Sequence, residues 1–186
     1  MKDLNDYSGG FDPDLRFEDF SKETLVKLLS VYAKLYQATD GMWYLSVKER
    51  VSNREAVACD LWVWDKMHRF EMARLCKALK IRRDGVAGLV KALQFGPWQF
   101  THEIDLELRG KHSAIMTISY CPTLEALERE GEGREQSICR EVEPAIKQKV
   151  AKFFHPSMEV SALRLPPRQT REICCQWEFN LPHVDS

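Results

Sequence analysis

The hydrophobic period changes once along this chain, at Gly96-Pro97, and that change limits the folds open to it. Before this step, apolar residues recur at helical spacing; after it, Ile104, Leu106 and Leu108 alternate with charged neighbours, as in a strand. A chain of 186 residues with 44% hydrophobic content can bury one sizeable core. The order of elements predicts an α+β fold, in which an N-terminal helical segment packs on a C-terminal antiparallel sheet with crossing helices.

The first twenty residues differ in composition from the rest. Residues 1–20 carry six acidic and two basic side chains and no sustained periodicity, which predicts a flexible acidic arm. Residues 21–186 predict a single α+β domain, with a helical half at 21–95 and a sheet half at 98–182.

Two serines are candidate N-caps in the helical half. Ser21 precedes an amphipathic helix expected to reach about residue 37, and Asp40-Gly41 is expected to end it. Ser52 and Glu55 form a capping box that opens a long helix through Lys80. The predicted apolar face of this long helix comprises Ala56, Val63, Met67, Phe70 and Ala73.

The sheet half is expected to begin with a hairpin. Ile104 to Arg109 and Ser113 to Tyr120 alternate with period two around Gly110, which is a turn residue. Before the hairpin, Asp84 is a candidate cap for a short helix. The remaining predicted elements are helices at 122–130 and 143–154 and strands at 158–165 and 173–181.

The charge balance argues against polyanionic partners. Twenty-seven basic and 28 acidic side chains give a formal charge of -1, so neither a nucleic acid nor a membrane surface is an expected partner. No stretch approaches the ~20 apolar residues of a membrane-spanning helix, and the N-terminus has no signal pattern. These observations predict a cytoplasmic protein.

Six cysteines are more than packing alone requires in a reducing compartment. Cys121 follows a strand and precedes a helix, Cys139 follows a glycine-containing loop, and Cys175 lies on the inward face of the last strand, whereas Cys174 is expected to point away. If Cys121, Cys139 and Cys175 converge, they predict a site for zinc or another soft transition metal with one position open for water. The alternative is that each cysteine is a small buried side chain.

A polar stripe follows the long predicted helix. Asp60, Trp64, His68 and Glu71 succeed one another at i+4 and i+3 steps. Asp60 and Glu71 are three turns apart, about 16 Å, so each needs a partner from another element, such as Asp40 or the pair His102-Glu103. Only one member of that pair is expected to enter a pocket, because neighbouring strand residues point to opposite faces. The alternative is an exposed helix face with surface salt bridges.

Five tryptophans are many for this length. Trp43, Trp98 and Trp177, together with Asp60, are candidate ligand contacts in an aromatic-walled pocket. The alternative is that the tryptophans are large core side chains.

A set of motifs resembles a family of uncharacterised bacterial and archaeal cytosolic proteins related to the L-2-amino-thiazoline-4-carboxylate hydrolases. The resemblance covers about residues 24–179, and its most specific part is the Cys-x-Trp-Glu-Phe segment that ends there. The motifs are Asp40-Gly41-x-Trp43, Asp60, Trp64, Glu71-x-Ala73-Arg74, Gly96-Pro97-Trp98, Cys121-x3-Glu125-Ala126, Cys139 and Cys175-x-Trp177-Glu178-Phe179. More distantly, the sheet half resembles the vinyl-reductase-type small-ligand-binding domains.

The resemblance implies a small-molecule hydrolase that acts on a C–N or C–S bond of a small heterocycle. In this hypothesis a thiol of Cys121 or Cys175, or a metal-bound water, attacks the substrate, and Glu71 or His102 is the base. A non-catalytic sensor for a small ligand or a metal, and a scaffold with buried thiols, are the alternatives. The apolar residues of the helix from Leu25 to Tyr36 are explained either by a homodimer or by packing within one chain.

Overall fold

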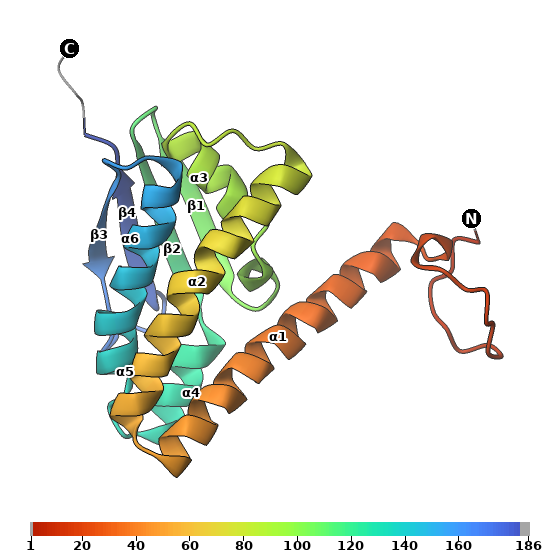
Figure 1. The fold of residues 1–186 in the computed structure, drawn as a ribbon, viewed down its shortest axis with the longest axis horizontal. Coiled ribbons are helices and arrows are strands. Elements are labelled where there is room, and N and C mark those ends of the chain that lie inside the picture. Colours follow the sequence, from red (N-terminus) through yellow and green to blue (C-terminus); the bar gives the residue numbers. More distant parts are fainter. Residues whose placement is uncertain (1, 183–186) are drawn as a thin grey trace.

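The computed structural model describes residues 2–182 and has an α+β fold, as the sequence predicts. Four antiparallel strands in the order β1-β2-β4-β3 form one sheet, and helices α2, α3 and α6 lie against one of its faces (Figure 1). Residue 1 of the predicted arm and residues 183–186 of the predicted domain lie outside the described residues. No helix within residues 2–182 is both long enough and apolar enough to cross a membrane.

Helix α1 (Lys22–Arg50) is continuous, so the predicted break at Asp40-Gly41 is wrong. The Ser21 hydroxyl accepts a hydrogen bond from the Thr24 amide at 3.3 Å and caps the helix, as predicted. A glycine inside a helix destabilises it by only about 0.5–1 kcal/mol relative to alanine. A single Asp-Gly step therefore does not end a helix whose C-terminal half packs on α2.

The N-terminal half of α1 projects away from the sheet (Figure 1). At its far end, η1 (Phe17–Asp19) and the residues before it fold back on the helix start. The Leu4 amide donates to the Asp19 carbonyl at 2.8 Å, and the Ser21 amide donates to the Leu4 carbonyl at 2.9 Å. The flexibility of this acidic segment stays a prediction.

Helix α2 (Asn53–Leu79) begins and ends where the sequence predicts. The Ser52 hydroxyl accepts from the Glu55 amide at 3.1 Å, and Lys80 stops the helix in the left-handed conformation at φ 53°. The predicted apolar face is right at Ala56, which is 1% exposed, and wrong at Phe70, which is 49% exposed, and at Ala73, which is also exposed. Besides Ala56, the helix buries Trp64, His68, Met72 and Cys76.

Two short elements connect α2 to the sheet. Helix α3 (Val86–Leu93) begins after Gly85 at φ 92°, so the predicted cap at Asp84 is wrong. The short helix η2 (Pro97–Phe100) follows the predicted helix stop at Gly96 and contacts α1.

The sheet confirms the predicted hairpin and the sidedness of the strands. Strands β1 (Glu103–Arg109) and β2 (Ser113–Tyr120) pair antiparallel, and β4 (Cys175–Asn180) lies between β2 and β3 (Glu159–Arg164). Trp177 and Phe179 of β4 are buried under the helices. On the other face the Gln176 amide donates to Thr117 at 2.9 Å, and Ile115 is the buried apolar residue among its strand positions. One face of the sheet therefore carries the core.

The segment between β2 and β3 is helical for most of its length. It consists of α4 (Pro122–Glu130), α5 (Glu135–Ser137), the π-helical turn η3 (Ile138–Val142) and α6 (Glu143–Phe154). Pro144 has no N–H to donate to the Arg140 carbonyl, so the regular α-helical ladder is interrupted there. The resulting π turn was not predicted, and turns of this kind occur often at functional sites.

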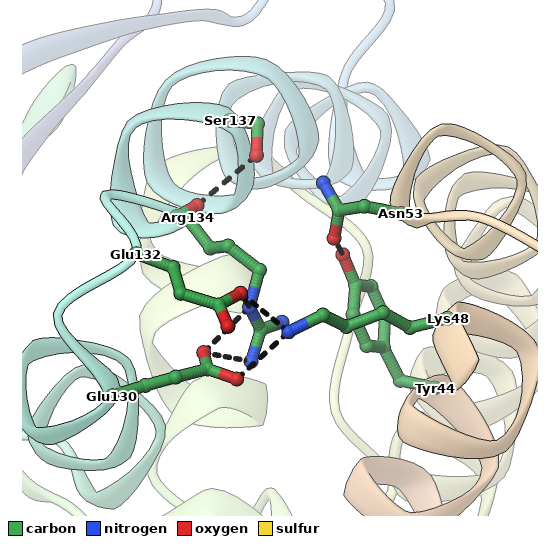
Figure 2. Close-up of polar contacts among 7 residues, drawn as sticks. All are labelled: Tyr44, Lys48, Asn53, Glu130, Glu132, Arg134 and Ser137. Atoms are coloured by element: carbon green, nitrogen blue, oxygen red, sulfur yellow. Dashed lines mark hydrogen bonds and ion pairs between the residues drawn. The ribbon is translucent and has the colours of Figure 1, made fainter.

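An ion-pair network joins the C-terminal half of α1 to the end of α4 and the segment after it (Figure 2). The Lys48 ammonium contacts Glu130 at 2.8 Å and Glu132 at 2.6 Å, and the Arg134 guanidinium donates to Glu130 at 2.6 Å. The Tyr44 hydroxyl donates to Asn53 of α2 at 2.8 Å. The network therefore fixes where α1 places Asp40, one turn before Tyr44.

Candidate functional site

A cavity of about 190 Å³ lies between the sheet, α2, the start of α4 and the π turn. Two hydrophobic clusters meet there: one includes Met72, Trp177 and Phe179, and the other includes Trp64 and Val142. For comparison, an apolar cavity of about 150 Å³ in another protein holds benzene. The space therefore suits a small organic molecule.

The polar stripe of α2 forms one wall of this cavity. Asp60, Trp64, His68 and Glu71 all line it, as does Asp40 from α1. The alternative of an exposed helix face is therefore wrong. The stripe faces inward because α1 and the π turn cover it, which periodicity within α2 does not reveal.

Glu71 is the most unusual polar group of the site. Both of its carboxyl oxygens are buried, and neither has a hydrogen-bond partner. A Cβ at Gly96 would lie 3.3 Å from the Glu71 Oε1 atom, so only a glycine leaves this carboxyl its present room. Burial raises the Glu71 pKa from its ordinary value of 4.5 to about 7.

Asp40 and Asp60 form a carboxyl pair between α1 and α2. Burial raises the Asp60 pKa to about 7, and the neighbouring charges of Asp40 and Glu143 add to the shift. Burial and the Glu143 charge raise the Asp40 pKa to about 6. A hydrogen bond from the Trp64 side chain partly opposes both shifts. The predicted partnership of Asp60 with Asp40 is thus present.

Aromatic rings from three elements adjoin these carboxyl groups. The Trp64 and Trp98 ring centroids are 5.3 Å apart, and Tyr36 of α1 lies 5.7 Å from Trp98 and 6.2 Å from Trp64. His102 meets Trp98 edge-on at 5.7 Å. Burial, with the charges of Glu71 and Asp40, raises the pKa of the Tyr36 hydroxyl. The predicted aromatic wall is present at Trp98.

The two histidines of the cavity are held neutral near pH 7. Burial lowers the His68 pKa to about 4, and its Nε2 atom has no hydrogen-bond partner. Burial also lowers the His102 pKa, and the Thr101 hydroxyl lies 2.9 Å from its Nδ1 atom. His102 lines the cavity whereas Glu103 is exposed, so only one member of this pair enters, as predicted.

A partly exposed ion pair at the start of α6 completes the polar set, and the sequence analysis missed it. Glu143 and Lys147, one turn apart at the start of α6, form a salt bridge, and the ammonium lies 4.8 Å from the Trp177 ring centroid. Burial alone would raise the Glu143 pKa and lower that of Lys147, but the attraction of the pair outweighs burial in both groups. The Glu-to-Lys spacing of four residues was a signal that could have found it.

Cys121, Cys139 and Cys175 line the same cavity, from the α4 cap, the π turn and the start of β4. Burial raises the pKa of each thiol, that of Cys121 to about 12. All three are therefore protonated at neutral pH. Cys174, expected to point away, is instead buried against the β2 end, where its thiol donates to the Ser119 carbonyl at 3.2 Å.

The predicted metal site consists of the three thiols that line the cavity. Within residues 2–182, no three His, Cys, Asp or Glu side chains are grouped as ligands of one metal ion. Zinc or another soft transition metal at Cys121, Cys139 and Cys175 stays a prediction.

Two predicted ligand contacts lie outside the cavity or in its wall. Trp43 is 67% exposed on α1 and adjoins a second space of about 20 Å³ between α1 and α2. Trp177 is buried in the wall, and its indole N–H lies 3.2 Å from the Cys175 sulfur. Trp43 therefore does not line the main cavity, but it lines the second space together with Asp40 and Asp60.

Comparison with known proteins places this chain in one family. Residues 18–181 match a family described as "Family of unknown function (DUF6125)", and the chain belongs to it. No curated protein and no solved structure matches the chain.

Proposed function

We propose that this member of the DUF6125 family binds a small molecule in the cavity, with the Glu71 carboxyl as the main polar contact. The observation that carries the proposal is that Glu71 has two buried oxygens without hydrogen-bond partners on the wall of a cavity of about 190 Å³. A buried polar group without a partner costs about 1–3 kcal/mol, and more if it is charged. A ligand that donates hydrogen bonds to Glu71 removes this cost.

The test is a thermal-unfolding screen of the purified protein against small heterocycles, combined with native mass spectrometry for co-purified molecules. A ligand at 100 times its dissociation constant stabilises the folded protein by about 2.7 kcal/mol, which is roughly 5–10 °C for a chain of this size. Val142→Phe is the matched variant, because Val142 lines the cavity and a larger side chain fills it. A ligand that stabilises both proteins equally binds elsewhere and contradicts the proposal.

The second candidate function is hydrolysis of a C–N or C–S bond in a small heterocycle, with Glu71 as general base. A base is most effective when its pKa is near the working pH, and the Glu71 pKa of about 7 meets this condition. The protonated thiols of Cys121 and Cys175 favour water as the attacking group. Glu71 then takes a proton from that water as the water oxygen bonds to the ring carbon. Glu71 returns this proton to the departing nitrogen or sulfur as the bond from that atom to carbon breaks.

Turnover of thiazolines and cyclic amidines by the wild type and by Glu71→Gln tests the hydrolase function. The variant is expected to lose about 10²–10⁴-fold in kcat, the usual contribution of a general base. In the wild type, kcat/KM should rise with pH through about 7, because the base must be ionised. Unchanged turnover in Glu71→Gln would remove Glu71 from the mechanism. Loss of turnover in Cys121→Ser or Cys175→Ser would return the attacking role to a thiol.

The other predictions from the sequence are kept as proposals. Zinc or another soft metal at Cys121, Cys139 and Cys175 is tested by metal analysis of protein purified without chelator. The cytoplasmic location and the expectation of no nucleic-acid partner rest on the sequence alone.

A further inference from the structure

The charged groups of the cavity leave an unbalanced set of carboxyl groups. Lys147 is the one lysine among the lining residues in the described part of the chain, where no arginine lines the cavity, and its charge is matched by Glu143. His68 and His102 are neutral near pH 7 because burial lowers both pKa values. Asp40, Asp60 and Glu71 therefore have no cationic partner in the cavity.

The unpaired state of Glu71 is a second and independent observation. Its two oxygens have no hydrogen-bond partner, and neither has Nε2 of His68, one turn earlier on α2 and only 9% exposed. Native structures rarely leave buried polar atoms in this state. Two such groups on one stripe of α2, both lining the same cavity, indicate a missing polar partner in that space.

The aromatic rings add a requirement of shape. Trp64 and Trp98 both line the cavity, and Tyr36 packs against both rings. Indole faces attract cations and stack on flat ligands. A positive group that lies between such rings and a carboxylate is attracted by the ring faces and by the carboxylate.

We propose that the ligand of this cavity is a planar organic cation, whose positive group pairs with Glu71 and whose flat body lies against Trp98 and Trp64. The inference rests on the proposed small-molecule site and names the chemical class that it takes. The Asp40-Asp60 pair lies about three helical turns from Glu71 along α2, so it favours a cation by its charge and makes no contact with the same group.

Cation binding at this site is coupled to proton release. Without the ligand, Glu71 holds its proton up to about pH 7, because burial disfavours the charged form. The other titratable groups around the cavity are the carboxyl groups of Asp40, Asp60 and Glu143, the ammonium of Lys147, the neutral His68 and His102, and the protonated thiols of Cys121, Cys139 and Cys175, with the Tyr36 hydroxyl near Glu71. An organic cation replaces the Glu71 proton, so the cavity keeps its net charge when the ligand enters. Binding therefore tightens as pH rises from 6 to 8.

Three probes of nearly equal shape test the charge directly. Benzamidine is a cation, benzamide is neutral and benzoate is an anion. Titration calorimetry at pH 8 is expected to show benzamidine binding at least about tenfold more tightly than benzamide, and benzoate more weakly still. Repeating the titration in buffers of different ionisation enthalpy is expected to show protons released on benzamidine binding.

Two substitutions test whether the Glu71 carboxyl is the group that recognises the positive charge of benzamidine. Glu71→Gln, which keeps the shape of the side chain, should weaken benzamidine by at least about tenfold and leave benzamide within about twofold. Glu49→Gln, an exposed change on α1, should leave all three probes unchanged. Circular dichroism of each variant verifies that it is folded.

The outcomes separate this inference from the function on which it rests. Tighter binding of benzamide or benzoate than of benzamidine, lost in Val142→Phe, overturns the cation class while the small-molecule cavity stands. Equal benzamidine affinity in Glu71→Gln also overturns the inference. Binding of none of the probes overturns it for planar cations of this size, and the proposed function is then decided by its own ligand screen.

Discussion

Gly41 and Gly88 both lie in helices, but an added methyl group meets opposite surroundings at the two positions. At Gly88 a Cβ would overlap the Arg82 carbonyl oxygen and lie 3.3 Å from Phe154, whereas at Gly41 nothing lies within 4 Å. Gly88→Ala is therefore expected to destabilise the protein by about 1–3 kcal/mol or more. Gly41→Ala should stabilise it by about 0.5–1 kcal/mol. Urea unfolding of both variants measures whether each substitution raises or lowers the free energy of unfolding. A stabilised Gly88→Ala would contradict the packing described.

The raised pKa of Glu71 makes stability depend on pH. In the unfolded chain this carboxyl has its ordinary pKa of 4.5, and in the folded protein its pKa is about 7. Between these values the folded state binds more protons, so this group's contribution to the free energy of unfolding falls as pH rises from about 4.5 to above 7. Glu71→Gln lacks the effect. The free energy of unfolding of Glu71→Gln, taken relative to that of wild type, should therefore rise by up to about 3 kcal/mol between pH 4.5 and pH 8.

Urea unfolding of wild type and Glu71→Gln at the two pH values measures this difference. The comparison is needed because other groups also make stability depend on pH. Burial raises the pKa values of Asp40 and Asp60, as it does that of Glu71, and lowers the pKa of His68. Glu49→Gln, which removes an exposed carboxyl, is the control. A pH-independent difference between wild type and Glu71→Gln would show that the carboxyl is not desolvated.

At the scale of the elements, the docking of α1 depends on the network around Arg134. The Arg134 side chain is 11% exposed, donates to Glu130 and lies 5.3 Å from the Tyr44 ring centroid. Arg134→Met should lower the free energy of unfolding by about 1–2 kcal/mol, because charge-assisted hydrogen bonds are lost. In a double-mutant cycle with Glu130→Gln, a coupling energy of at least about 0.5 kcal/mol is expected. Arg54→Met, on the exposed surface of α2, is the control, and additive effects of the pair would exclude a structural role for the contact.

Element boundaries were predictable where local chemistry sets them. The Ser52 cap of α2, the Gly110 hairpin and Pro122 at the start of α4 all act through their immediate neighbours, and the structure confirms them. The prediction of a break at Asp40-Gly41 is wrong because a local propensity of about 1 kcal/mol is smaller than the packing of α1 on α2. The exposed-face alternative for the polar stripe of α2 is wrong for a similar reason, since another segment covers it.

At the scale of the whole molecule, the projecting half of α1 exposes an apolar surface. Val26 is 54% exposed, Leu29 53% and Tyr32 51%, on the helix that packs on α2 further along. Half a helix without a packed face gains little stability in water. We propose that a second copy of the chain covers this surface, because a twofold axis sets two identical apolar stripes against each other.

Sedimentation equilibrium tests the dimer. The wild type should have a dimer mass at micromolar concentration, and Leu29→Asp should have a monomer mass with unchanged circular dichroism, because the charge falls in the interface. Lys34→Asp, an exposed change on the same half of α1, is the matched control. A monomeric wild type at all concentrations would contradict the proposal and leave another occupant for the surface.

The sequence by itself determined the fold class, the order of most elements and the inward face of the last strand, because periodicity, caps and turns act over a few residues. It also selected Glu71, His102, Cys121, Cys139 and Cys175, which all line one cavity. Only the tertiary structure decided that Asp40 joins Asp60, that Trp43 lies outside the main cavity and that the Glu71 carboxyl is left without a hydrogen-bond partner. These facts depend on which segments cover the α2 stripe, and burial, the main cause of the carboxyl pKa shifts, exists only once those segments have packed.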